Sequence, residues 1–176
     1  MLVVMGTTLL VSEEEYLRSS YSPDCDFEAG QVVERHVGER EHSILQRELV
    51  FFFRGLSAAT GLQVFPEQRI KVGEAQYRVP DVCVYRKPAP RDKVFTRPPL
   101  LVIEILSGED RMSRVRRKID EYLRFGVTYV WVIDPEARRA DVYTADRIYE
   151  ARERVLRIDD PMVEVPLDPI FQALDE

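Results

Sequence analysis

The sequence predicts a single α/β domain of 176 residues, built on a mixed β-sheet with helices on both faces. Residues 99–107 and 128–133 are nearly continuous apolar runs, which is typical of strands buried on both sides. A helical pattern separates the two runs, so a right-handed crossover would make them neighbouring parallel strands. The strands before them are joined by shorter connections, which favours antiparallel pairing.

The composition is that of a soluble globular protein, with 45% hydrophobic and 32% charged residues. No apolar run reaches the roughly 20 residues of a membrane span. The apolar start, residues 1–11, is short and runs into an acidic segment, so we do not expect a signal peptide. Two cysteines do not make a disulfide framework, which predicts a cytoplasmic location. The net charge of −6 argues against a protein that coats DNA, but it allows a local basic patch.

In the first half of the chain, Ser12 and Glu15 form a capping box that predicts a helix over Glu13–Arg18. Residues 27–35 surround Gly30 and predict a hairpin. Apolar residues then recur at helical spacing over residues 41–60, and Gly61 predicts a left-handed cap at the end of that helix.

The second half continues with predicted strands over residues 62–72 and 76–85, and a proline-rich loop over 86–98. A helix is expected over 112–125, ended by Gly126. Two or three short antiparallel strands are expected over 138–158, and a terminal helix over 167–174. The central order is therefore helix, strand, strand, strand, helix, strand over about 41–134, with extra β elements at both ends.

Glu104 lies in the middle of the apolar run 100–106. An ionised carboxylate inside a buried strand costs several kcal/mol unless it is paired or bound to a metal. Strand alternation places it on one face with Val102 and Leu106. The alternative is a glutamate on an edge strand, facing water or paired with an arginine.

Asp81 follows Pro80, which lacks an N–H donor and predicts an irregular or edge position in the strand. A Pro-Asp pair by itself usually marks a turn. Here it enters a strand, and the buried-strand carboxylate of Glu104 follows later in the chain. Two carboxylates brought together repel each other, and hard oxygen ligands suit Mg²⁺ or Mn²⁺.

Lys118 is the third candidate, at the border of the apolar face of the helix over 112–125. Its stem can lie along the core while its amine reaches the strand ends, although a solvated lysine would look the same. The same helix is rich in arginine, which indicates either a solvated face or a patch that contacts phosphate. The candidates for such a patch are Arg111, Arg114 and Arg117.

Three further residues could assist the site. His42 opens the long helix, where a surface or capping histidine is the alternative. Asp26 and Glu34 flank the glycine turn, and either could supply another carboxylate. Motifs of serine hydrolases, P-loop enzymes and zinc sites are missing from the sequence.

Several segments together resemble the Uma-type restriction endonuclease family, also labelled domain of unknown function eight-twenty. They are VPDVCVY (79–85), PPLLVIEILS (98–107), Lys118 with Tyr122, GVTYVWVIDP (126–135), and CDFEAGQVVER (25–35) with His42. The resemblance implies the PD-(D/E)XK nuclease fold, with Asp81 as its aspartate and Glu104 as its acidic partner. It also implies that Asp26 stands where relatives usually carry glutamate.

One position departs from that pattern. The fold's motif has a lysine two residues after the glutamate, and this chain has Leu106. In this fold a lysine from the next helix can take its place, and Lys118 is the candidate.

Three hypotheses follow. The first is a Mg²⁺- or Mn²⁺-dependent endonuclease acting on DNA, in which Asp81, Glu104 and Lys118 are catalytic and Asp26 is a further metal ligand. The second is a catalytically inactive binding or assembly module. The third is a structural homodimer whose acids only satisfy arginines; dimerisation is expected from the β-rich C-terminal third and from habits of the fold.

Overall fold

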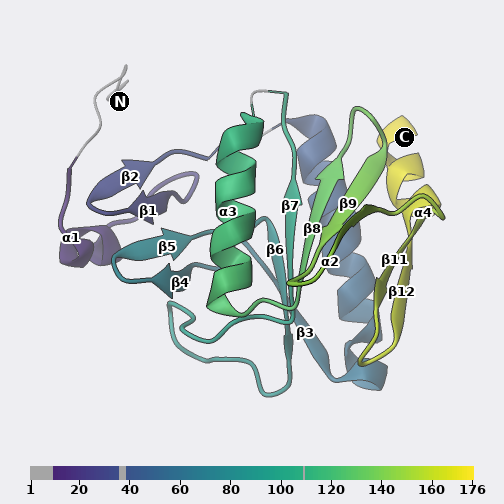
Figure 1. The fold of residues 1–176 in the computed structure, drawn as a ribbon, viewed down its shortest axis with the longest axis horizontal. Helices are drawn as coiled ribbons and strands as arrows, with labels where there is room; N and C mark the ends of the chain where they lie inside the picture. Colours follow the sequence, from purple (N-terminus) through teal and green to yellow (C-terminus); the bar gives the residue numbers. More distant parts are fainter. Residues whose placement is uncertain (1–9, 36–38, 109) are drawn as a thin grey trace.

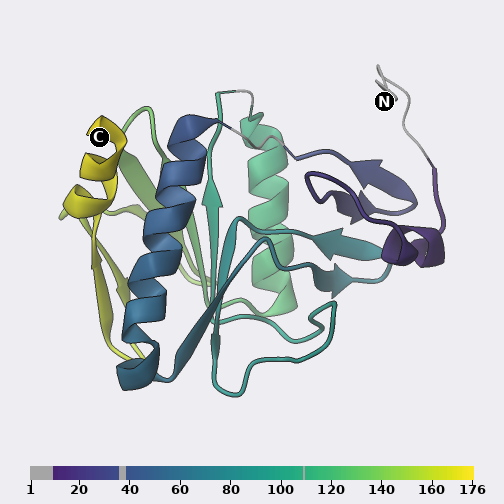
Figure 2. The same ribbon diagram turned by 180° about the vertical axis from the view of Figure 1, so that it is seen from behind.

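The computed structural model describes residues 10–35, 39–108 and 110–176, so most of the apolar start lies outside it. Its centre is a six-stranded sheet with helix α2 (Arg40–Thr60) on one face and helix α3 (Met112–Phe125) on the other (Figures 1 and 2). The predicted mixed sheet with helices on both faces is confirmed.

The central sheet has the strand order β10-β9-β8-β7-β6-β3. β7 and β8 pair in parallel, joined by the α3 crossover, while the other neighbours are antiparallel. This is the pairing that the two continuous apolar runs predict. The strands are β3 (Leu62–Pro66), β6 (Val82–Arg86), β7 (Leu101–Ile105), β8 (Tyr129–Asp134), β9 (Arg139–Tyr143) and β10 (Ile148–Glu150).

Two separate apolar cores lie on the two faces of this sheet. On the α2 side, Leu49 and Phe53 pack against Leu101 and Ile103. On the α3 side, Val102 packs in a cluster with residues of α3. The alternation predicted for β7 therefore holds, and it directs Glu104 to the α3 side.

A second, four-stranded sheet lies beside the central one, in the order β2-β1-β5-β4 (Figure 1). The hairpin predicted around Gly30 forms two of its strands, and the capped helix α1 (Glu13–Arg18) packs on it through Tyr16. The strands are β1 (Asp26–Glu28), β2 (Gln31–Val33), β4 (Ile70–Gly73) and β5 (Gln76–Arg78).

Two strand predictions were wrong in their extent. Residues 62–72 divide into β3 and β4, and residues 76–85 divide into β5 and β6, with one strand of each pair in each sheet. The second break falls at Val79–Asp81, because Pro80 has no N–H with which to continue a ladder. Asp81 is thereby placed at the junction of the two sheets.

The C-terminal third forms a hairpin of β11 (Val155–Ile158) and β12 (Val163–Pro166), followed by α4 (Leu167–Gln172) and a 3₁₀ turn (Ala173–Asp175). These elements close the α2-side core through Leu156, Val165 and Phe171. None of the helices in the described ranges combines the length and apolar composition that a membrane span requires.

Candidate active site

The pairing of β6 with β7 brings Asp81 and Glu104 together. Val82 pairs with Ile103 in the antiparallel register, and one further step along both strands places Asp81 opposite Glu104. Residues opposite each other in such a pair have Cβ atoms about 4.5–5.5 Å apart. The backbone N–H of Ile105 donates to Asp81 Oδ2 at 2.7 Å, which holds the Asp81 carboxylate at the end of β7. Both acids are buried. Each lies two residues from a member of the α3-side core, Cys83 for Asp81 and Val102 for Glu104, so strand alternation places both on that side of the sheet.

Cationic side chains surround Asp81. Arg35 Nη2 donates to Asp81 Oδ1 at 2.6 Å, and His42 Nε2, from the first turn of α2, lies 3.1 Å from the same oxygen. Burial by itself would raise the pKa of Asp81, but His42 and Arg35 outweigh it and lower the pKa. Burial likewise opposes protonation of His42, and Asp81 reverses this, so that the pKa of His42 is raised.

Glu104 has weaker positive compensation. Tyr122 Oη donates to Oε1 at 2.7 Å, and Lys118 Nζ donates to Oε2 at 3.3 Å. Burial raises the pKa of Glu104; Lys118 opposes this, but the charges of Asp81 and Asp26 add to the rise. The two facing acids therefore differ, since the neighbours of Asp81 lower its pKa while the pKa of Glu104 is raised.

Lys118 bridges the two sheets. Its amine lies 3.3 Å from Glu104 and 3.2 Å from Asp26 Oδ2, so it points into the acidic cluster and not into solvent. Asp26 belongs to β1, and its other oxygen accepts from the N–H of Val79 at 2.8 Å. Leu106, at the position of the motif lysine, packs in the α3-side core instead.

Arg78 is a fully buried cation beside this cluster, and the sequence reasoning did not single it out. It contacts Glu28 at 2.5 Å, Glu121 at 2.6 Å and Asp26 at 3.3 Å. Arg78 lies two residues before Pro80 in a segment otherwise suited to a strand, and this position was the sequence signal that could have pointed to it. Arg35 was also missed, and nothing around it in the sequence distinguishes it from a surface arginine.

The three arginines predicted to contact nucleic acid lie on or just before α3, and none of them contacts Asp81 or Glu104 within the described residues. Arg111 precedes the helix and is exposed, as is Arg117, which lies 3.4 Å from Glu28. Arg114 Nη1 donates to the backbone oxygen of Glu34 at 3.4 Å. Glu34 contributes that carbonyl oxygen, and its side chain is exposed.

The cluster has more carboxylates than permanent cations. Five carboxylates meet four permanent cations: Asp26, Glu28, Asp81, Glu104 and Glu121 against Arg35, Arg78, Arg117 and Lys118. Carboxylate oxygens are the ligands that Mg²⁺ and Mn²⁺ prefer. In the part of the chain that the structure describes, no three His, Cys, Asp or Glu side chains are arranged to hold a metal jointly. Asp81 and Glu104 would therefore be a two-carboxylate site, with other positions left for water or phosphate.

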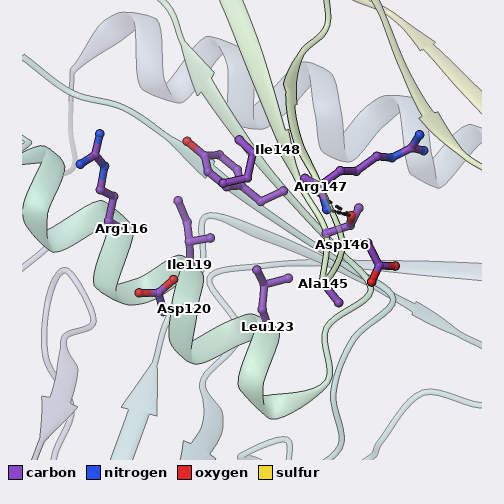
Figure 3. A pocket seen from close by; sticks show the side chains of 10 residues that line it. Arg116, Ile119, Asp120, Leu123, Ala145, Asp146, Arg147 and Ile148 are labelled. Carbon is purple, nitrogen blue, oxygen red and sulfur yellow. Dashed lines mark hydrogen bonds between the residues drawn. The ribbon is translucent and has the colours of Figure 1, made fainter.

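A cavity of about 700 Å³ lies elsewhere, between α3 and the β9–β10 hairpin (Figure 3). Ile119, Leu123 and Ile148 contribute apolar walls, and Arg116, Asp120 and Arg147 polar ones. None of the clustered carboxylates lines it. The chemistry of the candidate site is thus separate from this hollow.

The model of the Uma2 family, described as "Putative restriction endonuclease", matches residues 13–173. The chain belongs to the Uma2 family. The resemblance inferred from the motifs is confirmed, and the match spans both sheets and all the residues of the acidic cluster.

A solved structure supports the Uma2 fold. A protein from Anabaena variabilis ATCC 29413, described as "a putative nuclease belonging to DUF820", aligns with a TM-score of 0.79 and 22% sequence identity. The alignment covers 96% of this chain and 99% of the other. The search of curated proteins found no match.

Proposed function

We propose that this Uma2 protein is a divalent-metal-dependent endonuclease that hydrolyses phosphodiester bonds in DNA. The observation that carries the proposal is the cross-strand placement of Asp81 and Glu104, two buried acids on one side of the sheet, with the Lys118 amine 3.3 Å from Glu104. Asp81 and Glu104 would hold Mg²⁺ or Mn²⁺, and Asp26 would be a further carboxylate of the site. When bound, such an ion lowers the pKa of a coordinated water and offsets phosphate charge.

Lys118 would act as a fixed positive charge and not as a proton acceptor. Burial disfavours its charged form, but Glu104 and Asp26 outweigh burial and raise its pKa. An amine that stays protonated can orient a water and stabilise the charge that develops on a phosphate in the transition state. Asp26 and Tyr122 would keep Lys118 and Glu104 in place, and His42 would position Asp81.

Arg111, Arg114 and Arg117 would contact the DNA backbone. They follow one another at helical spacing along α3, the helix that also carries Lys118. Contacts of this kind position a duplex without reading its sequence. The overall negative charge of the protein then matters less than this local cationic surface.

Plasmid nicking tests the proposal. The protein is incubated with supercoiled plasmid and Mg²⁺ or Mn²⁺, beside Asp81→Asn and Glu104→Gln; Asp120→Asn, which removes an exposed carboxylate of α3, is the control. We expect nicking by the wild type and the control, and loss of nicking in both site variants. Nicking that persists in Asp81→Asn and Glu104→Gln would exclude this site.

An inactive binding module is the second candidate, favoured by Leu106 at the motif-lysine position and by the Arg35 contact that already neutralises Asp81. Calorimetric titration with Mn²⁺ separates the two. Binding that is lost in Asp81→Asn and Glu104→Gln supports the metal site, whereas no binding by the wild type supports the module.

Location and assembly are part of the proposal. Cys25 and Cys83 are both free and buried, which is in keeping with a reducing cytoplasm. A homodimer is expected from the fold, and sedimentation velocity would test it.

A further inference from the structure

Arg35 combines deep burial with an incomplete set of partners. Its side chain is 3% exposed, and its Nη2 makes the 2.6 Å contact with Asp81. Nη1 has no hydrogen-bond partner within the described ranges, and its nearest carboxylate is Glu67 at 3.6 Å. An unsatisfied buried donor costs about 1–3 kcal/mol, so a group that completes its bonding would be favoured here.

Nη1 is itself buried, but the carboxylate nearest to it reaches the surface. Glu67, beside Nη1, has a side chain that is 42% exposed. The neighbouring residue, Glu34, is contacted by Arg114, one of the proposed DNA-contacting arginines of α3. One of the proposed DNA-contacting residues thus lies against the backbone of the residue that precedes Arg35.

The chemistry of the Arg35 guanidinium and of its partner Asp81 indicates which ligand would bind. A guanidinium presents a planar fork of donors that matches carboxylate and phosphate oxygens, and it stays charged at any working pH. Its present partner, Asp81, is one of the two acids proposed to hold the metal. Arg35 and a divalent cation on the same carboxylate would repel each other, so Arg35 opposes metal binding at Asp81.

We infer that Arg35 is a phosphate-binding residue that occupies Asp81 until substrate arrives. This inference rests on the proposed function. A divalent cation replaces Arg35 at Asp81, and the released guanidinium binds a DNA phosphate through both edges of its fork. No covalent bond changes; one ion pair is exchanged for two. Metal and DNA consequently bind with positive cooperativity, and by linkage each strengthens the other.

Metal affinity in the absence of DNA gives the decisive readout. Calorimetry with Mn²⁺ compares the wild type with Arg35→Met, which removes the competing cation. We expect Arg35→Met to bind Mn²⁺ about tenfold more tightly. The matched control is Arg69→Met, because Arg69 makes a similar, largely buried pair with Asp24 away from the site; its Mn²⁺ affinity should equal that of the wild type.

DNA affinity gives the reciprocal readout. Fluorescence anisotropy with a short labelled duplex measures the Kd of each variant with and without Mn²⁺. Mn²⁺ should tighten DNA binding by the wild type about tenfold, and by Arg35→Met less than threefold. Arg35→Lys keeps the charge without the fork, so it should retain wild-type Mn²⁺ affinity but bind DNA more weakly.

The outcomes separate the two proposals. If the wild type binds no Mn²⁺, the metal-dependent function fails. Arg35→Gln replaces Arg35→Met if the latter does not fold. If the wild type binds Mn²⁺ through Asp81 and Glu104, and the Arg35 variant binds Mn²⁺ equally or more weakly, Arg35 is only structural. That result would overturn the present inference alone.

Discussion

Arg35 and Arg78 are two buried arginines that meet the same acidic cluster in different ways. Arg78 is surrounded by three carboxylates, those of Asp26, Glu28 and Glu121. Arg35 makes one close contact, with Asp81, and its Nη1 lies 3.6 Å from the partly exposed Glu67. Among the described residues each arginine has one Nη atom without a hydrogen-bond partner, but Nη2 of Arg78 still lies 2.6 Å from Glu121, whereas Nη1 of Arg35 lies 3.6 Å from Glu67. An arginine held by three carboxylates joins elements together, whereas one held closely by a single carboxylate is more readily released to a ligand.

The positions of the two arginines fit this difference. Arg78 ends β5 and ties the small sheet to α3 through Glu121. Arg35 follows β2 and contacts Asp81, one of the two facing acids. We therefore assign Arg78 to the structure and Arg35 to the function, and the following predictions test that division, from the largest expected effect to the smallest.

Arg78→Met should lower the free energy of unfolding by about 3–5 kcal/mol, because it leaves three carboxylates without their buried partner. Urea denaturation followed by circular dichroism measures this. Arg117→Met removes an exposed arginine that touches the same Glu28, and it should change stability by less than about 1 kcal/mol. Equal effects of the two changes would break the assignment of Arg78 to the structure.

Lys118 joins the two halves of the cluster, since its amine contacts both Asp26 and Glu104. Lys118→Met should reduce the plasmid nicking rate by about 100-fold through loss of charge stabilisation. Arg116→Met, at an exposed position of the same helix, should leave the rate within about twofold. A Lys118→Met rate as high as that of Arg116→Met would remove lysine from the mechanism.

Glu104, the acid that faces Asp81, gives a pH-dependent test. Its folded pKa is raised by burial, which Lys118 opposes and Asp81 and Asp26 reinforce, above the ordinary value of 4.5. Between these two pKa values the unfolded state binds fewer protons, so the free energy of unfolding falls as pH rises. Glu104→Gln has no carboxyl group to titrate at this position, so its free energy of unfolding does not include this fall.

The stability of Glu104→Gln relative to the wild type should therefore improve from a pH below 4.5 to neutral pH. Urea titrations at both pH values measure it, with Glu136→Gln, an exposed acid, as the control. An unchanged difference between wild type and Glu104→Gln would mean that Glu104 is fully compensated by its neighbours.

Arg114→Gln should have the smallest effect, because it removes a single proposed phosphate contact. The slope of log affinity for DNA against log salt concentration should fall by about 1, while the nicking rate at saturating DNA stays unchanged. Arg124→Gln, near the other end of α3, should keep the wild-type slope. Equal slopes for Arg114→Gln and the wild type would place the DNA elsewhere.

Local patterns predicted most of the fold. The bounds of α3 and the buried nature of β7 follow from apolar periodicity and the cap at Gly126, because these depend on residues close in the chain. The same local signals singled out Asp81 and Glu104, since an acid in an apolar run is unusual wherever it is found. The prediction of one strand over 76–85 was wrong because its two halves belong to different sheets, and no local sequence pattern indicates this.

The sequence by itself determined the order of the elements, the family and the two central acids. Only the tertiary structure decided which cations meet those acids: Arg35 is 46 residues from Asp81 in the chain, and Arg78 is 43 from Glu121. Long, flexible side chains reach partners set by sheet pairing and helix packing, and these long-range contacts leave no periodic trace around the arginines. The proposed division between a structural and a ligand-binding arginine accordingly depends on contacts that exist only in the folded cluster.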